Sequence, residues 1–310
     1  MCLFFGLSAF PLTPTDQGGR LKPDTLAWHV ERLVTAGVDS IGLLGSTGSY
    51  AYLTMEARMR TVRVGAEAIG GRVPLVVGIG ALRTDEAAAL SRDAAEAGAD
   101  GVLLAPMSYQ KLTEDEVYQH FKAVAAAGRL PLCIYNNPGT TNFNFSRDLI
   151  ARLSRLPHVE GVKMPLPVNG DFKGELAGLR SMTAQGFSIG YSGDWGVKNA
   201  LQAGADAWFS VVAGLLPGPA RQLARAAASG DPEEAARIDR AFEPLWATFR
   251  EFGSFRVMYA LANLLGEEEI EPLHPILPLA ADGRRKVRSA LSHLDAMMAS
   301  PDTIAPRSQP

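Results

Sequence analysis

Eight short runs of apolar and small residues recur along the chain, and none of them alternates strictly with polar residues. A strand buried on one face alternates apolar and polar side chains, whereas a strand covered on both faces reads as a continuous apolar run. The pattern therefore predicts parallel strands at FFGLSAF (4–10), SIGLLG (40–45), VPLVVGIG (73–80), DGVLLAP (100–106), LPLCIYN (130–136), EGVKMP (160–165), FSIGYSG (187–193) and AWFSVVAG (207–214).

Segments with helical spacing lie between these runs. Several begin at Thr, Ser or Asp with an acid soon after and end at glycine, which are the residues that favour helix N-termini and C-termini. Strand-like runs that alternate with helices predict an α/β fold, the (βα)8 TIM barrel, with an open doubly wound sheet as the rival arrangement. The helical segments are 22–37, 54–70, 84–98, 113–128, 146–156 and 196–204.

The pattern changes after Gly214, where no further strand signal follows. Segments 217–230, 231–253, 254–266 and 282–299 read as the last barrel helix and about three additional helices. We expect a barrel over residues 1–225 and a C-terminal helical extension over 226–298. Residues 299–310 have no periodicity and are expected to form a disordered tail.

Composition and charge narrow the class of partner. With 47% hydrophobic and 20% charged residues among 310, the chain has enough apolar surface for a large core. A net charge of −3 and a pI near 6.0 give no field that would attract nucleic acid or an anionic membrane, so a small molecule is the expected partner.

The predicted location is the cytoplasm. Two cysteines, Cys2 and Cys133, are too few for a disulfide framework and fit a reducing compartment. The opening MCLFFGLSAFPLTPTD lacks a basic n-region and its apolar run ends at Pro11, which favours a first strand over a signal peptide. No later run is long enough to cross a bilayer.

In an α/β barrel the reactive groups stand at the C-terminal ends of the strands. Lys163 is the most informative candidate there, because the other six lysines fall in predicted loops or helices. Burial disfavours an ammonium ion, and a neutral amine is a nucleophile for carbonyl groups. A structural ion pair with Glu160 or another acid is the alternative. The polar residues that close the strand runs are Ser46, Thr47, Tyr135, Asn136, Lys163, Ser192 and Asp194.

The run GLLGSTGSY (42–50) supplies glycines, two hydroxyls and a turn before a predicted helix. Backbone amides and the hydroxyls of Ser46 and Thr47 would form a neutral cradle for a carboxylate, although a Gly-rich turn without a ligand is equally common. Tyr135 ends its strand either as a proton relay or as a core tyrosine whose hydroxyl contacts a backbone carbonyl. No Gly-Lys-Ser/Thr follows the turn, which excludes a nucleotide phosphate loop.

Metal and triad chemistry are not expected. The five histidines lie in predicted helices or connections, and no His or Cys pair has ligand spacing. Ser46 likewise has no strand-end histidine to activate it as a nucleophile.

Four motifs, GSTGS (45–49), YNNPGTT (135–141), GVKMP (161–165) and YSGDW (191–195), occur in order along the predicted βα units. In this order the chain resembles the dihydrodipicolinate synthase and N-acetylneuraminate lyase family, over residues 3–298. The family's G-[ST]-T-G-E turn is similar to the first motif, its Y-N-x-P signature to the second and its G-[IV]-K strand to the third.

The resemblance implies a class I lyase that requires no metal or organic cofactor. Lys163 would form an imine with pyruvate or another 2-oxo acid, and the enamine would then add to an aldehyde; the reverse cleavage and a related dehydration use the same intermediate. Tyr135 and Ser46 would relay protons. A homo-oligomer, tetramer or dimer, is also implied, with Tyr109 reaching across an interface. The expected substrate-binding residues are Ser46, Thr47, Gly48, Tyr109, Thr140, Gly193 and Phe209.

The chain also departs from the synthase pattern. Thr140 stands where synthases have an arginine that pairs with the second substrate's carboxylate, and Ser49 replaces the acid that closes the turn. Met164 follows the lysine in place of a glutamate. These differences favour a substrate other than aspartate semialdehyde, such as a hydroxylated 2-oxo acid. A true 4-hydroxy-tetrahydrodipicolinate synthase and a non-catalytic sensor of 2-oxo acids or amino acids remain the alternatives.

Overall fold

The computed structural model describes residues 3–266 and 269–299, and its centre is a closed barrel of eight parallel strands in sequential order. Pairing of the first strand with the eighth, through Gly6 and Ala207, closes the ring. The predicted (βα)8 barrel is confirmed, and the open-sheet alternative is wrong. The strands are β1 Gly6–Ala9, β2 Ser40–Leu43, β3 Leu75–Gly78, β4 Gly101–Leu104, β5 Leu132–Tyr135, β6 Val159–Met164, β7 Ser188–Tyr191 and β8 Ala207–Ser210.

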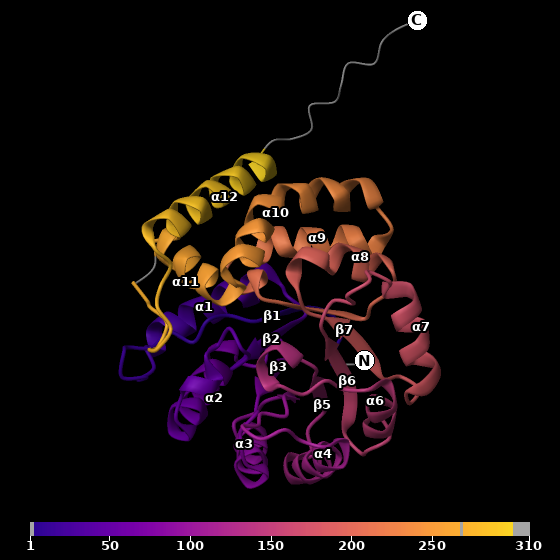
Figure 1. The fold of residues 1–310 in the computed structure, drawn as a ribbon. Coiled ribbons are helices and arrows are strands. Elements are labelled where there is room, and N and C mark those ends of the chain that lie inside the picture. The colour runs from indigo at the N-terminus through magenta and orange to yellow at the C-terminus, as the bar shows by residue number, and fades with distance from the viewer. Residues whose placement is uncertain (1–2, 267–268, 300–310) are drawn as a thin grey trace, which may run out of the picture.

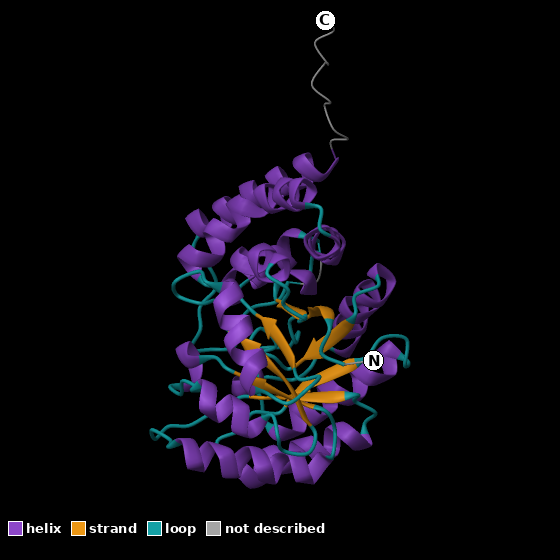
Figure 2. Ribbon diagram, turned by 90° about the vertical axis from the view of Figure 1, so that its right-hand side faces the viewer, coloured by secondary structure: helices purple, strands orange, loops and turns teal. Residues whose placement is uncertain are grey.

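Helices surround the barrel on its outside, as Figure 1 and Figure 2 show. Every segment predicted to be helical contains a helix. The helices are α1 Pro23–Ala36, α2 Met55–Ile69, α3 Thr84–Glu96, α4 Glu114–Gly128, α5 Pro138–Thr141, α6 Arg147–Leu153, α7 Phe172–Met182, α8 Val197–Gln202, α9 Pro217–Ser229, α10 Pro232–Phe252, α11 Ser254–Leu264 and α12 Ala281–Ala299.

Local capping chemistry explains where several helices begin and end. Thr113 accepts a hydrogen bond from the amide of Glu116, and the Glu116 carboxylate accepts one from the amide of Thr113, so α4 begins with a capping box. Gly37 ends α1 in the left-handed conformation that glycine adopts without a steric penalty. Helix α7 was missed by the sequence patterns, because Gly174 and Gly178 lower its helical propensity.

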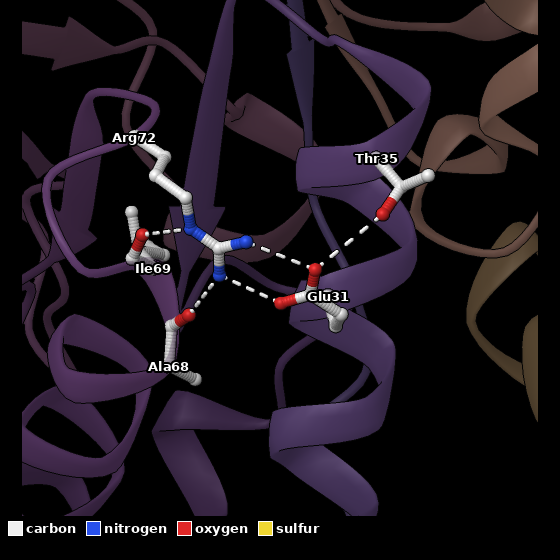
Figure 3. A network of polar contacts seen from close by, with 5 residues as sticks. All are labelled: Glu31, Thr35, Ala68, Ile69 and Arg72. Carbon is white, nitrogen blue, oxygen red and sulfur yellow. Dashed lines mark hydrogen bonds and ion pairs between the residues drawn. The ribbon is translucent and has the colours of Figure 1, made fainter.

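An additional polar network joins α1 to the end of α2 (Figure 3). The Arg72 guanidinium binds both carboxylate oxygens of Glu31, at 2.9 and 2.6 Å, and also donates to the carbonyls of Ala68 and Ile69. These hydrogen bonds lower the pKa of Glu31 and satisfy two carbonyls at the helix C-terminus. One side chain therefore caps α2 and links it to the preceding helix.

Side chains alternate between two cores, one inside the barrel and one between the strands and the helices. On β5, Cys133 and Tyr135 belong to the inner core, while Leu132 and Ile134 belong to the outer one. This alternation follows from the period of two in a strand. It decides which residues of each buried run face the interior.

The C-terminal helices pack against one side of the barrel, with α12 lying along α10 (Figure 1). The expected division at residues 225/226 falls within α9, which continues to Ser229, so the domain division remains a prediction. Of the expected tail, only residue 299 is described, and the remainder lies outside the described residues. Within the described ranges, no helix combines the length and the apolar character needed to cross a membrane.

Candidate active site

Lys163 projects into the interior of the barrel from β6. It lies in register with Tyr135 on β5, so both side chains face inward. The side chain is 3% exposed, and its Nζ lies 4.3 Å from the ring centroid of Phe10 and 4.2 Å from that of Tyr135. Among the described residues, no carboxylate lies within 4.0 Å of this nitrogen. Lys163 therefore does not form the alternative ion pair with Glu160.

Two further polar side chains meet at the hydroxyl of Tyr135. The Oγ of Ser46 lies 3.2 Å from it, and the Nδ2 of Asn137 donates to it at 3.1 Å. Because the amide occupies an acceptor position of the phenol, the phenolic proton is available for Ser46 or for a bound molecule. The arrangement joins the ends of β2 and β5 beside the Lys163 amine.

The turn after β2 is held in a constrained conformation. Leu44 and Ser49 have φ of 57° and 58°, in the left-handed region that residues with a side chain rarely adopt. Between them, a Cβ on Gly48 would lie 3.0 Å from the Leu44 Cα, so a larger residue would fit only if the neighbouring backbone shifted. Strain of this kind is commonly retained at functional sites.

Ser49 contacts the C-terminal helices. Its Oγ lies 3.1 Å from the hydroxyl of Tyr259 on α11. Burial raises the pKa of Tyr259, so the phenol remains protonated and able to donate. A hydroxyl pair therefore occupies the position at which the family pattern carries an acid.

A cavity of about 650 Å3 opens from Lys163 at the C-terminal ends of the strands. Ser46, Thr47, Tyr135, Thr140 and Gly193, all predicted from the sequence, line it together with Lys163. Phe209 and Gly48 do not line it: Phe209 lies behind the amine, with its ring centroid 5.7 Å from Nζ, and Gly48 shapes the turn.

Tyr109 lies away from this cavity. Its side chain is 92% exposed and is not part of the cavity wall of this single chain. The predicted binding role therefore has no support within one subunit, and the idea that Tyr109 reaches across an interface remains a prediction.

The sequence patterns missed about half of the wall. One missed part follows β6 and β7 and includes Leu166, Val168 and Trp195. The other comes from the junction of α10 and α11 and includes Phe249 and Phe255. Apolar residues in loops carry no periodic signal, and only the break at Gly253, between two predicted helices, marks this second segment in the sequence.

Asp194, predicted as a strand-end residue, supports the cavity wall. Its carboxylate accepts hydrogen bonds from the Trp208 indole at 2.8 Å and from the backbone amides of Val212 and Val211 at 2.7 and 3.3 Å. Burial raises the pKa of Asp194, whereas these donors act in the opposite direction. The carboxylate thus ties the loop after β7 to the loop after β8.

Comparisons with known proteins match this architecture along nearly the whole chain. The family model described as "Dihydrodipicolinate synthetase family" matches residues 3–294. A 4-hydroxy-tetrahydrodipicolinate synthase of Methylococcus capsulatus is 34% identical, over 90% of this chain and 94% of the relative, and one of Neisseria meningitidis serogroup B is 32% identical, over 90% and 95%.

Solved structures agree with the sequence relatives. The crystal structure of a dihydrodipicolinate synthase from Agrobacterium tumefaciens superimposes with a TM-score of 0.93 at 55% identity, covering 94% of this chain and 98% of that one. The match includes both the barrel and most of the C-terminal helices. The chain therefore belongs to the dihydrodipicolinate synthetase family and is a Schiff-base-forming lyase of the class I aldolase type.

Proposed function

We propose that Lys163 is the imine-forming residue and that its substrate is pyruvate or another 2-oxo acid. The observation that carries the proposal is the placement of Nζ between aromatic rings, with no carboxylate of the described chain at ion-pair distance and an open cavity in front of it. The free amine adds to the ketone carbon, and the resulting carbinolamine loses water to give a protonated imine. Loss of a proton from the adjacent carbon then gives an enamine.

Tyr135 and Ser46 act as the proton relay. The phenol gives a proton to the departing hydroxyl of the carbinolamine and receives one when the adjacent carbon is deprotonated, with Ser46 as its hydrogen-bonding partner at 3.2 Å. Asn137 holds the phenol oxygen in place. Thr47 and the amides of the turn hold the carboxylate of the 2-oxo acid, in a neutral cradle.

The enamine carbon attacks the carbonyl carbon of an aldehyde and forms a carbon–carbon bond, and the reverse sequence cleaves it. The curated relatives are named 4-hydroxy-tetrahydrodipicolinate synthases, but Thr140 lines the cavity here and, being uncharged, cannot form an ion pair with a second carboxylate. We therefore propose an aldehyde other than that of the named synthases. The wider proposal is a cytoplasmic homo-oligomer that acts on small molecules and not on nucleic acid.

Reductive trapping tests the proposal. Borohydride added with pyruvate should convert the imine into a stable secondary amine, and peptide mass spectrometry should locate the added mass on Lys163. Lys163→Ala should give no adduct, whereas Lys173→Arg, which changes an exposed lysine of α7, should give the same adduct as the unaltered protein. A full adduct in Lys163→Ala would refute the assignment, and tight pyruvate binding without any adduct would indicate a sensor.

A further inference from the structure

The cavity is lined by polar and by apolar side chains, which we call its polar half and its apolar half. The polar side chains include Ser46, Thr47 and Asn137, and both Ser46 and Asn137 contact the hydroxyl of Tyr135. Large apolar side chains come from three separate segments of the wall, where the hydroxyls of Ser192 and Ser254 also lie: Leu166, Val168, Trp195, Phe249 and Phe255.

Neighbouring residues hold two side chains of the apolar half, Leu166 and Phe255, in place. The side chain of Leu166 lies against the turn that carries Trp195, because a Cβ on Gly193 or Gly196 would come within 2.8 or 2.6 Å of it. Both glycines therefore leave space for this leucine. Phe255 is held from the other side by Tyr259, with ring centroids 5.2 Å apart.

The apolar wall is also partly uncovered in the single chain. Trp195 remains 39% exposed and Val168 fully exposed at the mouth of the cavity. Large apolar side chains that stay exposed around a cavity mark a site for an apolar ligand.

None of the described residues that line the cavity offers a free cation to a second anionic group. Among its lining residues only Lys163 and Asp194 are of charged types. Lys163 is committed to the imine under the proposed function, and Asp194 is occupied by Trp208 and two backbone amides. A carboxylate on the second substrate would meet hydroxyls such as those of Thr140 and Ser254 on this side of the cavity, but no free cation and many apolar side chains, which is unfavourable for a buried charge.

We propose that the apolar half of the cavity binds an uncharged aldehyde that carries an aromatic or other apolar group. The inference rests on the proposed function, because the enamine on Lys163 is the partner of this aldehyde. The enamine carbon forms a bond to the aldehyde carbon, the aldehyde oxygen takes up a proton and becomes a hydroxyl, and water then releases the product from the lysine. In the reverse direction the substrate is a 4-hydroxy-2-oxo acid with an apolar group at carbon four.

A panel of three aldehydes with pyruvate tests the substrate class. Benzaldehyde represents the apolar class, glyceraldehyde the hydroxylated class and succinic semialdehyde the class with a second carboxylate. We expect kcat/KM for benzaldehyde to exceed the other two by about tenfold or more, because moving a hydroxyl or a carboxylate from water to apolar surroundings costs free energy. A preference for glyceraldehyde or succinic semialdehyde overturns the inference.

Borohydride trapping with pyruvate alone separates the two proposals. If the adduct forms on Lys163 but none of the aldehydes reacts, the apolar-aldehyde inference is wrong and imine formation stands. If no adduct forms with pyruvate or related 2-oxo acids, the proposed function itself fails.

Two variants test the pocket directly. Trp195→Ala should lower kcat/KM for benzaldehyde at least fivefold, while the pyruvate adduct still forms. Trp28→Ala is the matched control, because Trp28 is 44% exposed on α1 and lies outside the cavity. Thr140→Arg should raise kcat/KM for succinic semialdehyde by about tenfold, because it adds the missing cation. Equal losses in both tryptophan variants, or no gain in Thr140→Arg, overturn the inference.

Discussion

The hydroxyls of Ser49 and Tyr259 lie 3.1 Å apart and join the turn after β2 to α11 across 210 positions of the chain. Both residues are buried, at 2% exposure each. The contact fixes the C-terminal helices to the turn that carries Ser46 and Thr47. Stability and cavity shape are therefore linked at this pair.

We expect Tyr259→Phe to lower the free energy of unfolding by about 1–3 kcal/mol, because it leaves the buried Ser49 hydroxyl without its partner. Urea unfolding measures the change. In the double variant with Ser49→Ala both hydroxyls are removed, so the loss should be smaller than the sum of the two single losses. Strictly additive losses would show that the two hydroxyls do not interact.

Tyr135→Phe should reduce kcat by about 10²- to 10⁴-fold, the range typical of a lost proton-transfer group. The pyruvate adduct should still form on Lys163, more slowly, since the amine is unchanged. Stopped-flow trapping and steady-state assays measure the two steps. Tyr118→Phe is the control, because Tyr118 lies on α4 beneath Arg152. An unchanged kcat in Tyr135→Phe would remove the phenol from the mechanism.

The buried guanidinium of Arg58 binds the backbone at the end of β3. It donates to the carbonyls of Gly80 at 2.9 Å and Gly78 at 3.0 Å, and it lies over the ring of Tyr50. Arg58→Met should destabilise the fold by about 1–3 kcal/mol, because both carbonyls lose their donor. Thermal unfolding checks this value, and Arg60→Met on the exposed face of α2 is the control, for which little change is expected.

His120 should make stability depend on pH. Burial lowers its pKa to about 4 from 6.5, and its Nδ1 lies 2.9 Å from the Thr84 hydroxyl. Asp115 and Glu116 line a second pocket together with His120, away from the active-site cavity. Arg152 forms an ion pair with Asp115, and the Thr113 amide donates a hydrogen bond to Glu116.

The direction in which stability changes with pH follows from proton binding by the folded and unfolded chains. Well above pH 6.5 the imidazole is neutral in both the folded and the unfolded state. Between pH 6.5 and 4 the unfolded chain binds a proton that the folded chain does not, so stability falls as the pH falls. The loss should be at most about 1.4 kcal/mol per pH unit. Urea unfolding at pH 7 and 5 should show a smaller difference for His120→Gln than for the unaltered protein or for His293→Gln on α12. Identical pH profiles for all three would exclude His120 as the cause.

Much of the fold was predictable because short-range patterns of apolar and polar residues indicate most of its strands and helices. A strand covered on both faces is apolar at most positions, and a helix repeats its apolar residues every three or four positions, so the eight runs and most of the helices between them could be recognised. The polar residues at the strand ends were predictable for the same reason: a lysine such as Lys163 is conspicuous within an apolar run. Helix α7 escaped because its glycines weaken the local signal.

The sequence by itself determined the order of strands and helices and the positions of the strand lysine and of the Gly-rich turn, since these depend on neighbours a few positions away. Only the tertiary structure decided that Ser49 meets Tyr259, and that Leu166, Trp195 and Phe255 form one wall of the cavity. Closure of the barrel and docking of α10 and α11 bring these residues together. The physical reason is that contacts between distant segments depend on how the whole chain packs, which no local pattern of apolar and polar residues records.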